Sequence, residues 1–243
     1  MIAGAYLAGT NTRRVRRALK AAFERIKRGR EAKRREVEAE AARRALDRWE
    51  RSKPAYPRHK YLSAKGIEAH GLRQDADKLL VPIYDGETLI SVQQIAGDGD
   101  KRFTAGSRVE GGSYALGDLA PDIWIGEGFA TCATIHELTG SHVVVAFNSK
   151  NLLPVARRVR EAGPQVNIII SADDDYETSL KPGPCFGINP GIRDAEKAAK
   201  TASPWREQRQ SPRPQGSSIG MMGVVPRATN PFRGLTSPMN SDG

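Results

Sequence analysis

Two absences limit what this chain can be. Its 243 residues include only two cysteines, Cys132 and Cys185, and neither belongs to a CxxC pair. This spacing argues against a zinc site in this chain and suits a reducing compartment, so we expect a cytoplasmic protein. The sequence also has no run of about 18 or more apolar residues, which is what a membrane-spanning helix needs. We therefore expect no membrane partner.

Basic residues are concentrated in one part of the chain. Between Arg13 and Lys60 there are 19 Lys and Arg against 7 Asp and Glu, a net charge of +12. The rest of the chain has 19 basic and 21 acidic residues, a net charge of −2. The overall charge of +10 therefore belongs to one arm and not to the whole molecule.

The basic arm, residues 1–54, is predicted to be helical. Val15, Leu19 and Phe23 recur at the spacing of one helix face, and Pro54 ends the pattern. Two interpretations of its charge stay open. The arm is either a helix that its charges keep solvated, or an arm that follows a phosphate backbone.

From residue 55 to residue 120 the chain changes to short apolar runs and turns. Residues 79–84 and 88–95 read as two strands, and the Asp85-Gly86 turn between them indicates a hairpin. More glycine turns follow, and basic residues lie in the loops. We predict a small antiparallel subdomain rich in strands.

From residue 121 to residue 202 strands alternate with helices. Continuous apolar strands are predicted at 123–125, 143–147 and 166–170, with helices at 129–139, after residue 149 and after residue 189. This order indicates an α/β fold with a parallel sheet covered by helices on both faces. Residues 203–243 are rich in Pro, Ser, Arg, Gly and Met without periodicity, and we interpret them as a disordered tail.

Acidic residues follow two of the predicted strands. Glu127 lies in a glycine turn after the first strand, and Asp173, Asp174 and Asp175 follow the third. The carboxyl ends of parallel strands meet at one edge, where Asp173 and Asp175 can point the same way and Asp174 another. Crowded carboxylates repel one another unless a cation lies between them, and hard oxygen ligands select Mg²⁺ or Mn²⁺. Ordinary loop aspartates are the alternative, but the glutamate on a second strand favours a metal site.

This order of elements resembles the Toprim domain, which bacterial-type primases, topoisomerases and some nucleases share. The resemblance is closest to the Toprim primases of phages and plasmids, and it covers the chain from about Trp49 to Ala202. The segments that carry it outside the acidic turns are residues 59–67, 80–83, 101–103, 111–114, 130–134 and 189–191. The segments before residue 120 matter most, because topoisomerases and nucleases lack them.

The resemblance implies a reaction and its residues. Glu127, Asp173 and Asp175 would be catalytic and hold magnesium, with Asp174 a lesser ligand. The activity would be that of a DNA primase, a nucleotidyltransferase that makes short RNA primers on single-stranded DNA from nucleoside triphosphates. A replicative helicase is a further candidate partner.

The resemblance also implies basic residues near nucleotide or template. Lys101, Arg102 and Arg108 lie where the family has such residues, and Lys150 is a weaker candidate. Exposed surface charge is the alternative for each of them. Glu110 is an acid where the family tends to be basic, which argues against strong nucleotide binding at that loop.

Two departures from the family keep other functions open. Primases of this kind usually carry a zinc-binding domain, for which this chain has no cysteines. After the helix that follows Asn189, the family continues with a further strand, whereas this chain enters its Pro-rich tail. We interpret the chain as truncated or frame-shifted near Lys200. A Toprim nuclease and a non-catalytic nucleic-acid-binding remnant are therefore the alternatives to a primase.

Overall fold

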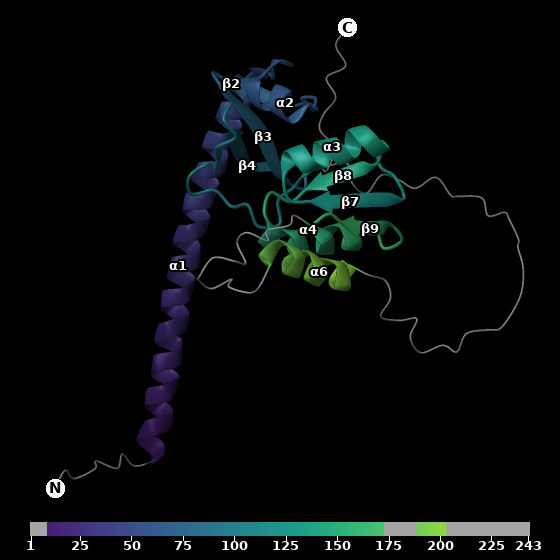
Figure 1. The fold of residues 1–243 in the computed structure, drawn as a ribbon. Coiled ribbons are helices and arrows are strands. Elements are labelled where there is room, and N and C mark those ends of the chain that lie inside the picture. Colours follow the sequence, from purple (N-terminus) through teal and green to yellow (C-terminus); the bar gives the residue numbers. More distant parts are fainter. Residues whose placement is uncertain (1–8, 173–188, 203–243) are drawn as a thin grey trace, which may run out of the picture.

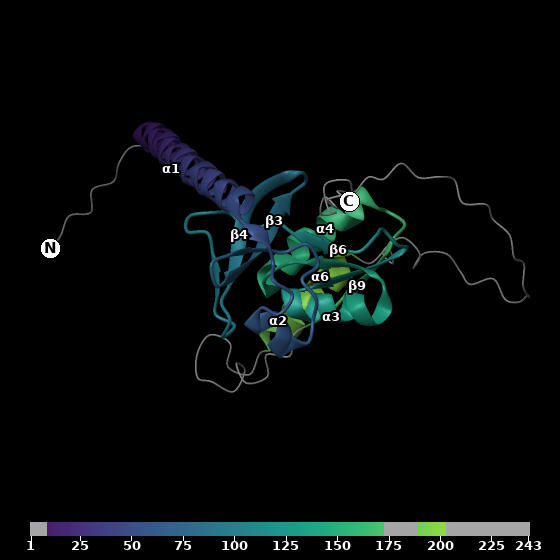
Figure 2. The same ribbon diagram turned by 90° about the horizontal axis from the view of Figure 1, so that it is seen from above.

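The computed structural model describes residues 9–172 and 189–202 (Figure 1). A long helix stands out from a body in which an antiparallel sheet lies beside a layered α/β unit (Figures 1 and 2). Within the described ranges no helix is long and apolar enough to cross a membrane.

The predicted long basic helix is confirmed as α1 (Gly9–Arg51), which runs unbroken through Gly29. Its last turns are the anchored part, because Ala41 and Ala45 are buried and Ala45 packs against strand residues of the first sheet. The guanidinium of Arg73 lies 4.9 Å from the ring centroid of Trp49 and adds a cation–π contact at the same place. The preceding turns stand clear of the body (Figure 1).

The predicted antiparallel subdomain is confirmed as a five-stranded sheet in sequence order. Its strands are β1 (Lys53–Pro54), β2 (Arg73–Asp75), β3 (Lys78–Asp85), β4 (Thr88–Ile95) and β5 (Lys101–Phe103), and helix α2 (Lys60–Lys65) lies between β1 and β2. The β3–β4 hairpin turns at Gly86, where a φ of 63° suits glycine.

A four-stranded sheet follows, in the order β6-β8-β7-β9. Its strands are β6 (Tyr114–Leu116), β7 (Asp122–Gly126), β8 (His142–Val145) and β9 (Asn167–Ile170). The predicted parallel pairing is confirmed for β7 with β8 and with β9. One strand differs from the expectation: β6 joins this sheet antiparallel to β8, whereas the sequence grouped it with the preceding strands. A three-residue strand carries no local signal for its partner.

Helices cover both faces of this sheet, as predicted. They are α3 (Phe129–Thr139), α4 (Ser149–Ala162) and α6 (Pro190–Ala202). Side chains alternate along β8, so that Val143 and Val145 pack in the core with Phe129 of α3, while Val144 packs with α4 and α6. The helix after β8 begins one residue earlier than a serine cap would place it, because the Asn148 side chain accepts a hydrogen bond from the backbone of Asn151 at 3.1 Å.

The two sheets share one core. Buried residues of the first sheet and of α2 belong to the same cluster as Tyr114, Phe129 and Val145 of the second unit. A backbone bridge between Tyr84 and Ser113 adds two hydrogen bonds of 2.9 Å. The first sheet is therefore packed directly against the α3 side of the second, and its loops reach the carboxyl ends of the parallel strands.

Candidate functional site at the carboxyl edge of the parallel strands

Glu127 stands at the end of β7, immediately before α3. The turn that carries it is held from both sides, because Ala146 donates to the oxygen of Gly126 at 2.7 Å and Ser171 donates to the oxygen of Ile125 at 2.8 Å. Glycine is required at position 126, since a Cβ there would lie 2.8 Å from the sulfur of Cys132. One carboxylate oxygen of Glu127, Oε1, is shielded from water.

The neighbouring strand β9 brings the chain to the same edge. Ile170 of β9 lies in register with Ile125 of β7, and the described segment ends two residues later, at Ala172. The predicted ligands Asp173, Asp174 and Asp175 lie outside the described residues. Among residues 9–172 and 189–202, no three His, Cys, Asp or Glu side chains lie together in a way that could hold a metal ion. Of the four predicted metal ligands, Glu127 is thus the one that lies within the described residues.

Lys101 comes to this edge from the first sheet. Its ammonium nitrogen lies 3.8 Å from the position that a Cβ would take on Gly128, the residue after Glu127. The same nitrogen lies 6.0 Å from the ring centroid of Tyr61 on α2. The hydroxyl of Tyr61 is buried and has no hydrogen-bond partner among the residues that the structure describes, and burial raises the pKa of this side chain. Two sheets and α2 therefore converge beside the turn that carries Glu127.

The end of β8 contributes a residue that the sequence did not single out. Phe147 has a φ of 71°, a left-handed conformation that costs a non-glycine residue about 1 kcal/mol or more. Its ring is buried and meets the ring of Phe103 on β5 edge to face, with 6.3 Å between centroids. Nothing in the apolar run around residue 147 marks this backbone, so pattern reasoning could not have found it.

The other predicted basic residues have different surroundings. Arg102 is exposed and pairs with Asp100 at 2.8 Å. Arg108 pairs with Asp85 and donates to the backbone oxygen of Glu110 at 2.9 Å. Lys150 is exposed in the first turn of α4. Of the four predicted basic residues, Lys101 is therefore the one that the described geometry places beside the turn of Glu127.

Arg108 belongs to an ion-pair cluster at the β3–β4 hairpin. Arg158 of α4 lies 2.6 Å from Asp85 and also donates to the oxygen of Gly111. Burial alone would raise the pKa of the Asp85 carboxyl, but hydrogen bonds and charge from Arg108 and Arg158 lower it below its usual value. This arrangement suits a structural role that joins the first sheet to α4.

Asn151 is the second residue that sequence reasoning missed. It is 2% exposed, and its side-chain oxygen accepts from Gly111 at 2.7 Å. Its amide nitrogen donates to the oxygens of Gly112 at 2.9 Å and Ala146 at 2.8 Å. One side chain thus joins the loop before β6 to the end of β8, beside Phe147. A single asparagine in a first helical turn gives no signal of such a role.

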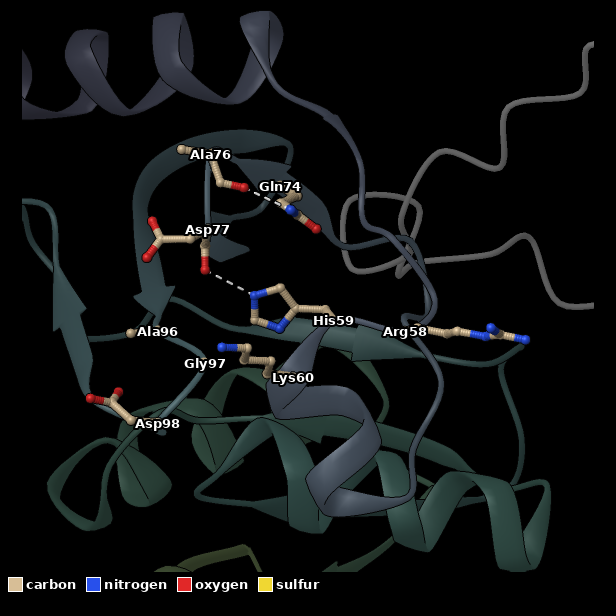
Figure 3. Close-up of a pocket in the computed structure, with 9 residues that line it drawn as sticks. All are labelled: Arg58, His59, Lys60, Gln74, Ala76, Asp77, Ala96, Gly97 and Asp98. Carbon is tan, nitrogen blue, oxygen red and sulfur yellow. Dashed lines mark hydrogen bonds between the residues drawn. The ribbon is translucent and has the colours of Figure 1, made fainter.

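A hollow of about 680 Å³ opens at the start of α2 (Figure 3). His59 is fixed there in one tautomer, because its Nδ1 accepts from the backbone of Tyr61 and its Nε2 must then donate to the oxygen of Asp77, at 2.9 Å (Figure 3). The residues that line this hollow are Arg58, His59, Lys60, Gln74, Ala76, Asp77, Ala96, Gly97 and Asp98.

A second hollow of about 400 Å³ shares two wall residues with the first, Gly97 and Asp98. It is also lined by Tyr61, Lys65 and Lys101. The concave surface therefore runs from the start of α2 to the lysine that reaches the turn of Glu127. Four basic side chains line it, Arg58, Lys60, Lys65 and Lys101, against two acidic ones, Asp77 and Asp98. This excess of positive charge suits an anionic chain or a phosphate more than a neutral ligand.

Comparisons with known proteins agree with the sequence resemblance. No family model matches the chain. It is 37% identical over 149 residues to a DNA primase TraC of Escherichia coli, an alignment that covers 58% of this chain and 14% of that protein. A second DNA primase TraC of Escherichia coli is 38% identical over 149 residues and is covered over 10% of its length. The predicted resemblance to plasmid-type primases is confirmed, and the chain spans a small part of these relatives.

Two solved structures also match. The primase fragment of the bacteriophage T7 primase-helicase protein gives a TM-score of 0.44 at 16% identity, over 64% of this chain and 67% of that one. The second structure is of bacteriophage T7 lagging-strand DNA polymerase with primase domains bound to an RNA/DNA hybrid and dTTP. It gives a TM-score of 0.41 at 16% identity, over 63% and 76% of the two chains.

Proposed function

We propose that this chain is the nucleotidyl-transferring part of a plasmid-type DNA primase, which makes short RNA primers on single-stranded DNA. Its similarity to two plasmid-type primases over 149 residues supports this assignment. The single observation that carries the site is the approach of Lys101 to the glycine turn of Glu127. A carboxylate and an ammonium group at one strand edge are the pair that triphosphate chemistry needs.

Magnesium or manganese would be held by Glu127 together with Asp173 and Asp175. Glu127 fits this role because it offers carboxylate oxygens at a strand end, with Oε1 turned away from water. Asp173 fits because in the sequence it follows Ala172, two residues after the end of β9, the strand that pairs with β7. A bound divalent ion would supply positive charge to the triphosphate of the incoming nucleotide. Asp174 is a lesser candidate ligand.

The chain's own residues would orient the reactants. The ammonium group of Lys101 would bind a phosphate oxygen in front of Gly128, where the backbone N–H groups of the first turn of α3 also attract anions. The 3′-hydroxyl of the primer would attack the α-phosphate, forming the new P–O bond as the bond to pyrophosphate breaks. Arg102, Arg108 and Lys150 are weaker candidates for contacts with template or nucleotide.

The partners of this reaction would be a single-stranded DNA template and nucleoside triphosphates. The resemblance alone suggests a replicative helicase as a further partner. The concave surface that runs from the start of α2 to Lys101 supports a template strand as a partner, because its lining has more basic than acidic side chains.

A labelled-nucleotide assay tests the proposal. The full chain is incubated with single-stranded DNA, labelled nucleoside triphosphates and Mg²⁺, beside the variants Glu127→Gln and Asp175→Asn. We expect labelled oligomers from the wild type and none from either variant. Shortened DNA in place of oligomers would show a nuclease, and a gel shift without chemistry would show a non-catalytic remnant. Either outcome would overturn the primase assignment.

A further inference from the structure

The outer half of α1, residues 13–36, has an unusual density of exposed positive charge. This segment contains 12 Lys and Arg and 3 Glu, and all 12 basic side chains are exposed. Within the described part of the chain, one of the twelve, Arg34, forms an ion pair, with Glu38 at 3.5 Å. Packing in the body does not account for these charges.

We propose that residues 13–36 of α1 bind the phosphate backbone of single-stranded nucleic acid, outside the site at Glu127. At about 1.5 Å per residue, 24 helical residues extend over about 36 Å. Twelve basic groups over that length stand about 3 Å apart along the axis. For comparison, each strand of a DNA duplex carries one phosphate per about 3.4 Å of its axis, so the charge density of this segment is comparable to that of a nucleic-acid backbone.

The basic groups surround most of the helix, and eight of the twelve lie on the half centred on Arg13. Because successive residues turn by about 100°, Arg17 and Arg28 share that half, whereas Leu19 and Ile26 lie on the other, together with Arg30 and Lys33. The exposed apolar side chains form a stripe, with Val15 at 49%, Leu19 at 53%, Phe23 at 69% and Ile26 at 50% exposure.

Acidic residues do not cancel the basic side. Glu24 and Glu31 lie on it, but each has basic residues three and four positions away, so the local charge stays positive. A second copy of this chain is a poor partner for the stripe, because pairing two such segments would bring together two net charges of the same sign. A polyanion removes this repulsion and releases counterions, which favours binding.

The C-terminal end of this segment of α1 lies close to a loop that leads to the candidate site. The loop after β5 meets α1 there: the side chain of Val37 lies 3.0 Å from the Cβ position on Gly106. Arg44 donates to the oxygen of Ala105 at 2.9 Å, which fixes this loop on the helix. The same loop follows directly from β5, the strand of Lys101. A nucleic-acid strand bound along α1 would therefore pass from the helix to the antiparallel sheet, whose strand β5 carries Lys101.

The inference is tested by equilibrium binding, not by catalysis. Fluorescence anisotropy with a labelled thymidine oligonucleotide is measured at several salt concentrations, in EDTA and without nucleotides. The test variant changes Arg13, Arg17, Arg28 and Arg35 to Gln, and the matched control changes the same four residues to Lys. All four side chains are exposed, so neither variant removes a packed group.

We expect the Gln variant to bind at least about tenfold more weakly and the Lys variant to bind as the wild type does. Each lost phosphate contact should also reduce the slope of log K against log salt by about 0.7. Glu127→Gln should bind normally in this assay, which separates a failure here from a failure of the proposed function.

Three results would overturn the inference. The Gln variant could keep the affinity and salt slope of the wild type. A variant of the stripe, Leu19→Gln with Phe23→Gln, could lose as much affinity although its charge is intact. Finally, the protein could bind vesicles of phosphatidylcholine and phosphatidylserine while failing to bind the oligonucleotide, which would assign the segment to a lipid surface.

Discussion

The rings of Phe103 and Phe147 meet edge to face, with centroids 6.3 Å apart and planes at 77°. This contact joins the last strand of the antiparallel sheet to the end of β8. Because Phe103 and Lys101 lie two residues apart on β5, their side chains leave the strand on the same side. The ring contact therefore fixes the strand that presents Lys101.

Loss of the Phe103 ring should impair the site more than the fold. Phe103 is 36% exposed, so Phe103→Ala should lower the melting temperature less than the loss of a fully buried ring would. We expect a raised KM for nucleotides, because Lys101 is no longer held in place. Phe103→Leu, which keeps an apolar contact, is the control, and steady-state kinetics with a melting curve for each variant measures both effects. A fall in stability with unchanged kinetics would contradict this role.

Lys101 and Arg102 provide a matched pair on one strand. Lys101→Gln should lower kcat/KM for nucleotides by about tenfold or more, because a charged hydrogen bond to phosphate contributes about 1.5–3 kcal/mol. Arg102→Gln removes the same charge from an exposed side chain that pairs with Asp100, and should change kcat/KM by no more than about twofold. Equal losses in the two variants would show that general charge, and not the place of Lys101, governs binding.

Metal binding should be visible without catalysis. If Glu127 holds Mg²⁺, the ion should stabilise the folded wild type, by about 2.7 kcal/mol when its concentration is 100 times the Kd. Glu127→Gln should keep its melting temperature in EDTA and lose most of the rise that Mg²⁺ gives. Differential scanning fluorimetry over a Mg²⁺ titration measures this. A wild-type rise that persists in the variant would place the ion elsewhere.

Asn151→Ala should be strongly destabilising. It leaves the backbone groups of Gly111, Gly112 and Ala146 without their buried partner, at a cost of about 3 kcal/mol. Asn167 is the control, because it is exposed and its side chain donates to the carboxylate of Asp122 at 2.7 Å. Its replacement by Ala should cost less than about 1 kcal/mol. Urea unfolding of the two variants compares them directly.

Mild acid should destabilise the protein through His142. This ring is fully buried, and desolvation lowers its pKa below 6.5, with His136 adding a smaller effect in the same direction against backbone bonds to Gly117 and Asp118. In the unfolded chain His142 takes up a proton near pH 6.5, whereas in the folded chain it does so only at lower pH. The free energy of unfolding therefore decreases as the pH falls below 6.5.

The variant His142→Asn checks this assignment. Asparagine can still donate to the oxygen of Gly117, which His142 contacts at 2.9 Å, but it does not titrate. The loss of stability between pH 7 and pH 5 should therefore be smaller in the variant. An unchanged dependence on pH would assign the effect to other groups, such as the Glu137 carboxyl that His70 contacts at 2.6 Å.

Local patterns predicted the elements better than their contacts. The span of α3 and the hairpin turn at Gly86 follow from spacing and turn residues, which act over a few positions. The partner of β6 could not be predicted, because a three-residue strand pairs according to the packing of two whole sheets. The antiparallel edge strand of the second sheet was missed for that reason.

In the candidate site, too, local patterns predicted the positions of residues along the chain but not their contacts. Glu127 lies at a strand end because apolar runs fix where strands stop, and the sequence contains those runs. Lys101 and Arg108 looked alike in the sequence, yet one reaches Gly128 and the other pairs with Asp85, since their places depend on how two sheets face each other. Asn151 and Phe147 carry no local pattern at all. The predictions for Asp173, Asp174 and Asp175 fall outside the described residues and stay predictions.

The pairing of β6 with β8 bears on how such a chain can be exchanged between larger proteins. A recombination junction placed just after β6 would strip β8 of an edge partner and open the core that Tyr114 shares with Phe129. A junction in the outer half of α1 would cut no buried contact that the body needs. Recombination between larger proteins would therefore preserve the two sheets as one unit and allow the projecting helix to vary.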